Sequence, residues 1–306
     1  MCEGETMRGW VFGLCVLAVS SGPVLAGDTQ GQTKLTTAAI LGVEGTVDLG
    51  TLGLQDPDMT GVSADGVVFV GRANFDALIW TKAQGATYVT NTCDCAGVLM
   101  GVSADGSEAA GYMGVNYTDH AIIWNRAEGL KDLGTFGGRH AQFQGISADG
   151  VIAVGTIEID DRDHAMIWTK TGGARNLGTF GHTSAEFDGI SQDGSIAVGW
   201  VQSNLERHGI VWTNTEGVTD LGAFGGTGAQ LNAVSADGSV AVGTVFTHDI
   251  YSNHAVIWTK AGGGKDLGTM GGTSAELYGI SADGSVAIGK VEVGGVNHVL
   301  LYAISK

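Results

Sequence analysis

The sequence predicts an all-β fold, a six-bladed β-propeller, because three markers recur along it with one shared period. The first marker is a Ser-x-Asp-Gly turn, whose aspartates follow one another at intervals of 40, 44, 44, 44 and 46 residues. The second is a tryptophan in each of the first five units, and the third is an Asp-Leu-Gly or Asn-Leu-Gly tripeptide. Self-similarity at a period of this length is typical of propellers and other repeat architectures. The turn aspartates are Asp65, Asp105, Asp149, Asp193, Asp237 and Asp283.

Each unit reads as four short strands, and the fifth unit illustrates them. Apolar runs at residues 230–235 and 240–245 flank an Asp-Gly turn, which favours a hairpin because glycine accepts positive φ. Two more runs follow at residues 254–259 and 265–270. Four strands in about 44 residues match one propeller blade. No unit holds an uninterrupted apolar period of 3.6, so a helical reading is excluded.

The ends of the repeat predict how the ring closes. The sixth unit stops after its third strand, at residues 296–304, and a sequence typical of the missing fourth strand stands at residues 46–51. Because an unpaired sheet edge favours aggregation, we expect residues 47–51 to pair with residues 296–302 and complete the last blade. Residues 46–306 then form one propeller domain.

Residues 1–26 have the features of a secretory signal peptide. Arg8 precedes an apolar run, and Val24-Leu-Ala26 resembles a cleavage site. The run is too short to span a bilayer comfortably, and no later stretch qualifies as a transmembrane helix. We therefore expect an exported protein, extracellular or at the cell surface, with the periplasm as an alternative. Residues 27–45 form a leader before the propeller.

The charge of the chain bears on its partners. The formal net charge is −17, of which residues 1–26 contribute −1 through Glu3, Glu5 and Arg8, so the remainder carries −16. An acidic chain of this kind argues against nucleic-acid binding, in which basic patches supply most of the affinity. The net negative charge suits a soluble protein with a solvated acidic surface, and it is also compatible with binding of a cation or a basic partner.

The loops between the second and third strands of each unit vary most in sequence, and rigid scaffolds often carry function on such loops. Propeller geometry places these loops on one face and the Asp-Gly turns on the other. Residues 160–163 form the densest acidic loop and invite comparison with a Ca²⁺ site, but they lack the spacing and glycine of an EF-hand loop, so we favour a surface loop. The binding-face candidates are Tyr117, Asp119, Asp160, Asp161, Asp163, Glu206, Arg207, His248, Asp249 and Tyr251.

A His-x-x-x-Trp pattern marks the third strand of four units. One interpretation is a ring of imidazoles that collects a metal or an anion. The other is packing between blades, with each tryptophan at an interface and each histidine hydrogen-bonded to a neighbouring segment. We favour packing, because the third strand is not innermost and its histidines should lie too far apart to share an ion. The pairs are His120 and Trp124, His164 and Trp168, His208 and Trp212, and His254 and Trp258.

Serine, histidine and aspartate recur in the second to fifth units, but this trio does not predict a catalytic triad. A hydrolase needs one activated nucleophile held by one base, whereas a trio repeated in every unit is better explained by the fold. Each serine immediately precedes a tight turn, where a hydroxyl commonly bonds the local backbone.

Cys93 and Cys95 are the only cysteines after the signal peptide. Two ligands one residue apart make at most half of a metal site, and no other cysteine completes it. A Cys-x-Cys disulfide is strained but compatible with an exported protein. We favour a disulfide or two thiols over metal.

Over residues 46–304 the chain resembles the HAF repeats of bacterial extracellular proteins, through Gly-Ile-Ser-Ala-Asp-Gly-Ser-x-Ala-x-Gly, His-Ala-x-x-Trp-Thr and Asp-Leu-Gly-Thr-x-Gly-Gly. Those repeats are named for His-Ala-Phe. Here Ile, Met or Val replaces the Phe after His120, His164 and His254, and Gly follows His208. The resemblance implies an exported bacterial protein, often the passenger of an autotransporter with a C-terminal barrel in the outer membrane. No barrel-length extension follows the repeats, so we expect a secreted form or a truncated relative, with cell-surface or outer-membrane association left open. The resemblance brings no ligand and no catalytic residues.

We therefore predict a binding or surface-interaction module for an unidentified protein or glycan, without catalytic residues, cofactor or metal. The alternative is a propeller hydrolase or lyase with a carboxylate site at the axial mouth, made by Glu186, Asp188 and Glu276 of the innermost strands. Such a site needs a defined separation between its carboxylates, which a sequence does not give. A structural stalk without a soluble ligand is a third interpretation.

Overall fold

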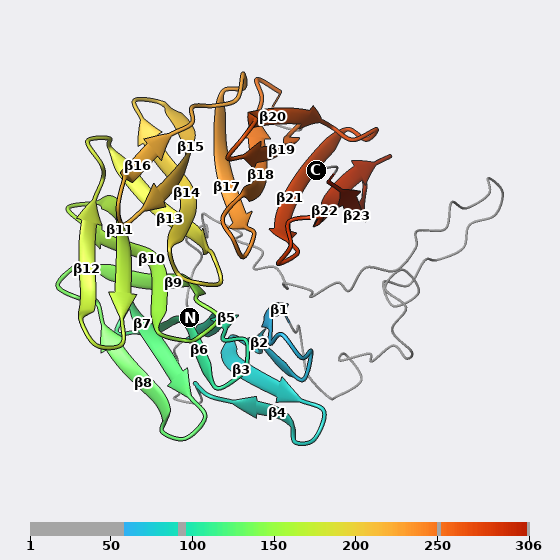
Figure 1. The fold of residues 1–306 in the computed structure, drawn as a ribbon. Coiled ribbons are helices and arrows are strands. Elements are labelled where there is room, and N and C mark those ends of the chain that lie inside the picture. Colours follow the sequence, from blue (N-terminus) through green and yellow to red (C-terminus); the bar gives the residue numbers. More distant parts are fainter. Residues whose placement is uncertain (1–57, 91–95, 250–251, 305–306) are drawn as a thin grey trace, which may run out of the picture.

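The computed structural model describes residues 58–90, 96–249 and 252–304, which form six antiparallel sheets arranged around a common axis (Figure 1). This confirms the predicted six-bladed β-propeller. The described residues are strands and turns, and they contain no helix of the length and apolar character that a bilayer crossing requires.

The blades follow one another in chain order. Blade one consists of β1 (Asp58–Val62), β2 (Val68–Ala73), β3 (Asp76–Thr81) and β4 (Gly85–Tyr88). Blade two consists of β5 (Gly97–Val102), β6 (Glu108–Val115), β7 (Thr118–Asn125) and β8 (Gly129–Gly134). Blade three consists of β9 (His140–Ile146), β10 (Ile152–Ile159), β11 (Arg162–Thr169) and β12 (Gly173–Gly178).

The second half of the ring repeats this order. Blade four consists of β13 (Ser184–Ile190), β14 (Ile196–Ser203), β15 (Glu206–Thr213) and β16 (Gly217–Asp220). Blade five consists of β17 (Gly228–Val234), β18 (Val240–Phe246), β19 (His254–Thr259) and β20 (Gly263–Gly268). Blade six consists of β21 (Ser274–Ile280), β22 (Val286–Val293) and β23 (Val296–Ala303).

Blade six has three strands within the described residues, whereas the other blades have four. The predicted closing strand at residues 47–51 lies outside the described residues. So do the signal peptide, the leader, Cys93 and Cys95. The predictions for these segments therefore remain predictions.

The fourth strand ends earlier than the sequence predicts. We expected residues 265–270 in blade five, but β20 ends at Gly268. Gly268 and Met270 have φ angles of 71° and 53°, so the backbone turns out of the sheet at the end of the Asp-Leu-Gly tripeptide. The following Thr-x-Gly-Gly segment is therefore a turn that leads to the next blade.

Apolar side chains of neighbouring blades pack into shared clusters that hold the ring together. Between blades two and three, Ile123 packs with Phe143, Met166 and Trp168. The rings of Phe143 and Trp168 lie 6.0 Å apart at a tilt of 55°. Equivalent clusters join the other consecutive blades from the first to the sixth. Trp168 therefore lies at a blade interface.

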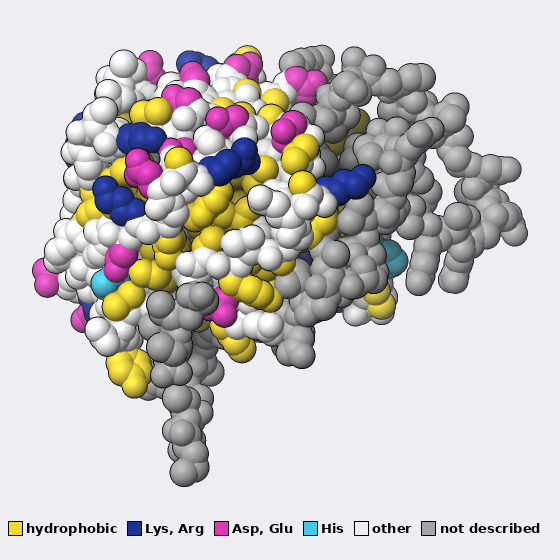
Figure 2. Space-filling model, turned by 90° about the horizontal axis from the view of Figure 1, so that it is seen from below, with side chains coloured by type: hydrophobic (Ala, Val, Ile, Leu, Met, Phe, Trp, Pro, Cys, Tyr) yellow, Lys and Arg dark blue, Asp and Glu magenta, His cyan; other side chains and the backbone are white. Residues whose placement is uncertain are grey.

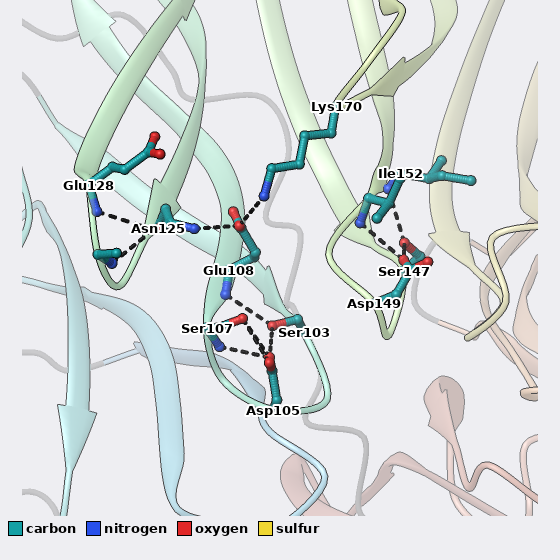
Figure 3. Close-up of polar contacts among 12 residues, drawn as sticks. Ser103, Asp105, Ser107, Glu108, Asn125, Glu128, Ser147, Asp149, Ile152 and Lys170 are labelled. Atoms are coloured by element: carbon teal, nitrogen blue, oxygen red, sulfur yellow. Dashed lines mark hydrogen bonds and ion pairs between the residues drawn. The ribbon is translucent and has the colours of Figure 1, made fainter.

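The Ser-x-Asp-Gly turns are closed by the same hydrogen bonds in each blade. In blade two the Ser103 hydroxyl donates to Asp105 Oδ1 (2.8 Å) and accepts from the backbone N–H of Glu108 (3.0 Å), as Figure 3 shows. The backbone N–H of Ser107 also donates to Asp105 Oδ1, at 2.9 Å. The other turn serines donate to their aspartates at 2.6 to 2.8 Å. These buried hydroxyls are engaged by the turn itself.

The histidines of the third strands contact the Asp-Leu-Gly or Asn-Leu-Gly tripeptide of the adjacent fourth strand. His208 Nδ1 lies 2.8 Å from Asp220 Oδ2, and the same Asp220 side chain accepts from the backbone N–H of Gly222 (2.8 Å). These contacts lie on the outer two strands, away from the axis and from the turn serines. The contacting pairs are His120 and Asp132, His164 and Asn176, His208 and Asp220, and His254 and Asp266.

Figure 2 views the molecule from the side of the ring. On the described part of that side, Lys and Arg side chains are interspersed with Asp, Glu and apolar side chains. No broad basic surface is visible there, which agrees with the acidic composition of the chain.

Candidate functional site at the axial cavity

A β-bulge interrupts the first strand of each blade at the same position. In blade three, Phe143 pairs with Gly155 and Gly145 pairs with Val154, which leaves Gln144 as an extra residue between them. A bulge re-aims the side chain that it carries, and all six bulge residues line one cavity on the propeller axis. The bulge residues are Thr60, Met100, Gln144, Asp188, Asn232 and Tyr278.

A glycine on the second strand makes room for each bulge. A Cβ atom at Gly155 would lie 2.0 Å from the carbonyl oxygen of Gln142 and 2.9 Å from the Cα of Phe143. The equivalent glycines would place a Cβ 1.9 to 2.1 Å from a carbonyl oxygen. This glycine ends the Ser-x-Asp-Gly-Ser-x-Ala-x-Gly unit, so that part of the repeat preserves the bulge. The equivalent glycines are Gly71, Gly111, Gly199, Gly243 and Gly289.

The axial cavity has a volume of about 430 Å³. It extends from Gln230, Glu276 and Lys290 on the hairpin side, past the bulge residues, to the Ser-x-Asp-Gly turns. Gln144 of blade three is only 8% exposed, yet its Oε1 has no hydrogen-bond partner. Oδ2 of Asp188 in blade four is likewise buried and unpartnered. Buried polar atoms without a partner are uncommon in folded proteins. Blades three and four thus present unused polar atoms at the cavity wall.

The bulge side chains of blades five, six and one are engaged within the protein. Asn232 Nδ2 donates to a backbone carbonyl of blade six at 2.7 Å. The Tyr278 hydroxyl donates to Glu276 Oε2 at 2.6 Å, and Thr60 donates to a backbone carbonyl of blade two. The cavity wall is therefore asymmetric, although the backbone repeats.

On the hairpin side of the bulges, the residue that precedes each third-strand histidine contacts the first strand of the next blade. Three of these junctions pair a hydrogen-bond donor with an acceptor. The pairs, each donor first, are Gln142 and Asp119 (2.6 Å), Arg207 and Gln230 (3.0 Å), and Asn253 and Glu276 (2.9 Å).

The junction between blades three and four brings two carboxylates together instead. Asp163 and Glu186 occupy the equivalent positions and line a second, smaller cavity, described below. In the described residues, Glu186 accepts only a long bond from Gln144 Nε2 (3.4 Å). The guanidinium of Arg207 donates to Gln230 and lies 4.0 Å from the ring centroid of Trp200. Its charge partly offsets the rise in the pKa values of Asp163 and Glu186, but it hydrogen-bonds to neither. No donor side chain bridges the two acids.

Burial and mutual repulsion raise the pKa values of these carboxyl groups. Burial, followed by the charge of Asp163, raises the pKa of Glu186 to about 7. Burial and then the charge of Glu158 raise the pKa of Asp163. Burial and then the charge of Glu186 raise the pKa of Asp188 well above its ordinary value. Raised pKa values clustered in a cavity mark a candidate functional site.

A second cavity, the inter-blade pocket, lies where blades two, three and four meet. Its volume is about 180 Å³. Thr156 is 7% exposed, and its Oγ1 has no hydrogen-bond partner. Among the described residues, no three His, Cys, Asp or Glu side chains converge as metal ligands do. The pocket is lined by Asp119, His140, Gln142, Thr156, Glu158, Asp163 and Glu186.

Some of the predicted binding-face residues gather around these cavities. Asp119 and Asp163 line the inter-blade pocket, and Arg207 lies beside it. Tyr117 is fully exposed at the tip of the β6–β7 hairpin, on the same face as the pocket. The second-to-third-strand loops were predicted to lie on the face opposite the Asp-Gly turns. In blade three, Glu158 beside the β10–β11 hairpin pairs with His140 at the start of β9, whereas Ala153 pairs with Ile146 at the end near the Asp149-Gly150 turn, which agrees with that prediction.

Other predicted residues lie apart from the cavities. Asp160 and Asp161 form the tip of the β10–β11 hairpin, where Asp161 Oδ1 lies 3.6 Å from the Arg139 guanidinium. Glu206, His248 and Asp249 are exposed on other hairpins. Tyr251 lies outside the described residues.

The three carboxylates of the predicted axial site are only partly brought together. Glu186 and Asp188 flank Phe187 on one strand and interact electrostatically. Glu276 lies two blades further on, with Oε1 3.3 Å from Lys290 Nζ. Sequence reasoning missed His140, Thr156 and Glu158, because nothing in the repeat shows that they face Glu186.

No known protein family matches the chain, and no curated protein sequence matches it. Solved structures share its fold at low identity. TolB from Acinetobacter baumannii is 13% identical with a TM-score of 0.52, and the match covers 77% of this chain but only 60% of that protein. A protein of Agrobacterium tumefaciens assigned as TolB is 15% identical with a TM-score of 0.54, over 83% and 91% of the two chains. Oligogalacturonate lyase from Vibrio parahaemolyticus is 13% identical with a TM-score of 0.56, over 80% and 77%. These matches establish the propeller fold.

Proposed function

We propose that this chain is an exported binding propeller that recognises its ligand at the hairpin-side mouth of the axial cavity. The observation that carries the proposal is the pair of buried, unpartnered atoms at the wall, Gln144 Oε1 and Asp188 Oδ2. Unpaired buried polar groups cost free energy. A ligand that hydrogen-bonds to both would remove that cost.

The distribution of sequence variation supports the same mouth. The bulge position differs in all six blades, while the residue before it is always a large apolar one and the residue after it is always Gly or Ala. The packing residues therefore repeat and the cavity-facing residue does not. This is the pattern expected when a symmetric scaffold presents an asymmetric binding site.

The ligand class that we propose is a protein or a glycan outside the cytoplasm. Export rests on the signal-like residues 1–26 and on the resemblance to the HAF repeats of bacterial extracellular proteins. We extend the proposal to a surface-interaction role for the module, since exposed Tyr117 and Leu205 stand on hairpins of the same face.

Photo-crosslinking in cells that produce the protein tests the binding face. A photo-crosslinking amino acid at position 117, near the mouth, should capture the ligand, and one at position 216, on a strand-three-to-four turn of the opposite face, should not. The further change Asp188→Asn should weaken capture from position 117. If the ligand is a glycan, a glycan array probed with the parent protein and with the Asp188→Asn variant should show weaker binding by the variant. Equal capture from positions 117 and 216, together with ligand binding that is unchanged in the Asp188→Asn variant, would contradict the proposal.

A lyase or hydrolase is the second candidate, and one observation favours it. The pKa of Glu186 is raised to about 7, and a group with such a pKa is suited to general acid or base catalysis at neutral pH. Mass spectrometry of oligosaccharides incubated with the protein would reveal cleavage. Loss of that cleavage in Glu186→Gln, with retained thermal stability, would establish the enzyme. Absence of any cleaved product would leave the binding role.

A further inference from the structure

We propose that the inter-blade pocket binds the side-chain ammonium of a lysine carried by a protein or peptide ligand. This inference rests on the proposed binding function and specifies the chemistry of the partner. It starts from the junction between blades three and four, where Asp163 and Glu186 line one pocket and no donor side chain joins them.

The other junctions show what this one lacks. Between blades two and three, Gln142 donates to Asp119, and between blades five and six, Asn253 donates to Glu276. The same backbone positions in blades three and four supply two carboxyl groups, which are both acceptors when ionised, and no amide or cationic donor. A cationic donor from outside would complete the junction in the way that an amide completes the others.

A buried hydroxyl gives the second, independent observation. Thr156 lies on β10, opposite Gln142, and is more than nine-tenths buried. It lines the pocket with an Oγ1 atom that has no partner. An ammonium group has three donors and no acceptor, so the carboxylates of Asp163 and Glu186 together with Thr156 Oγ1 offer it three acceptors.

The volume of the pocket and the number of its acceptors select among cations. About 180 Å³ is well below the volume of a typical small-molecule site, so the pocket accepts one side chain and not a whole ligand. A bare metal ion does not suit it, because no three acidic or histidine side chains of the described residues converge as ligands. We choose the ammonium of lysine over the guanidinium of arginine because its three donors equal the three acceptors in number, whereas a buried guanidinium would bring five donors.

Two exposed apolar residues favour a peptide over a small amine. Tyr117 of blade two is 100% exposed and Leu205 of blade four is 96% exposed, each on a hairpin adjoining the pocket's blades. Residues on either side of a bound lysine would meet these two side chains.

Calorimetry with two peptides tests the inference on the purified propeller. Both are capped pentapeptides with leucine beside the central residue, which is lysine in one and norleucine in the other. We expect the lysine peptide to bind about tenfold more tightly or better. Asp163→Asn and Glu186→Gln should each remove most of that preference. Glu216→Gln, an exposed acid on a turn of the opposite face, is the matched control and should change nothing.

Each outcome decides the inference. Equal affinity for the two peptides, no binding of the lysine peptide at millimolar concentration, or an unchanged preference in the Asp163→Asn, Glu186→Gln double variant would overturn it. Circular dichroism of each variant checks that the fold is kept. If the lysine preference fails while capture from position 117 still depends on Asp188, the lysine assignment falls and the binding function stands. If both fail, the binding function falls as well.

Discussion

Lys170 of blade three lies with Nζ 2.6 Å from Oε1 of Glu108 in blade two (Figure 3). Glu108 is only 5% exposed, and Asn125 of its own blade donates to the same oxygen. The pair is thus an inter-blade link with a buried acceptor and a lysine that is more than half exposed. Removing one partner of such a pair leaves a buried charge without compensation.

Lys170→Met should therefore lower the midpoint of thermal unfolding by a few degrees. The double variant Glu108→Gln, Lys170→Met should recover much of that loss, because the amide of glutamine needs no cation. Differential scanning calorimetry of the two variants measures both effects. A double variant less stable than Lys170→Met alone would contradict this account of the link.

Gly155 permits the bulge that presents Gln144, and its replacement should be costly. A Cβ at Gly155 would lie 2.0 Å from the carbonyl oxygen of Gln142, a distance that only backbone movement relieves. We expect Gly155→Ala to lower the free energy of unfolding by about 3 kcal/mol. Urea denaturation measures the loss.

Gly173→Ala is the control for this substitution. Gly173 has a φ of 70°, and a Cβ atom there would meet no other atom within 4 Å. Alanine at this position should therefore lower the free energy of unfolding only through the left-handed backbone, by about 1 kcal/mol. Equal losses at the two glycines would show that close approach to the carbonyl oxygen is not what the bulge requires.

The turn aspartates should make the propeller sensitive to acid. Hydrogen bonds from the backbone and hydroxyl of Ser107, and then from Ser103, lower the pKa of Asp105 to about 2. The pKa of Asp237 is lowered to about 2 by the equivalent bonds. A carboxyl whose folded pKa lies below its unfolded value contributes stability above the unfolded pKa and loses it as pH falls through the folded pKa. Stability should thus decline between about pH 4 and pH 2.

The substitution Asp105→Asn isolates the contribution of this one turn to the loss of stability in acid. Solvent screens an exposed carboxylate, so we expect a loss of roughly 1 kcal/mol at pH 7 and a smaller difference at pH 2. Urea denaturation of the variant and the parent at the two pH values gives the comparison. A difference that is the same at both values would remove the link to the titration of Asp105.

The fold was predictable because its determinants are local and repeated. Asp-Gly turns, apolar strands and the fixed period specify a blade. Each blade repeats the serine–aspartate hydrogen bond seen at Ser103 and the close approach of a glycine to a carbonyl oxygen seen at Gly155. The end of the fourth strand was misplaced, because the positive φ at Met270 is not evident from an apolar residue in an apolar run.

The candidate site was less predictable because it depends on pairs of residues in different blades. Asp163 was identified on its loop and Glu186 on its strand, but their shared pocket follows from the way blade three abuts blade four. No sequence pattern marks Thr156, because its place in the site depends on a hydrogen-bond partner that is missing in the folded protein. The place of Glu186, Asp188 and Glu276 on the innermost strands was the signal in the sequence that pointed to the axis.

Glu186 should also make stability depend on pH, in the direction opposite to the turn aspartates. Its side chain faces Asp163 on β11, Asp188 on β13, Gln144 on β9 and the guanidinium of Arg207 on β15. Burial, and then the charge of Asp163, raises its pKa to about 7 from an ordinary value of 4.5. The native state therefore holds a proton that the unfolded chain has released, and native stability falls as pH rises from about 4.5 to about 7.

Glu186→Gln removes this titration and should stabilise the protein at high pH. We expect the variant and the parent to be nearly equal in stability at pH 4, and the variant to be more stable at pH 8 by on the order of 2 kcal/mol. Urea denaturation at several pH values between 4 and 8 measures the difference, with Glu216→Gln as a control that should track the parent throughout. A constant difference across this range would mean that Glu186 is charged in the native state at all these pH values. The two acids would then coexist without a donor, and the need for a cation at their junction would lose its physical basis.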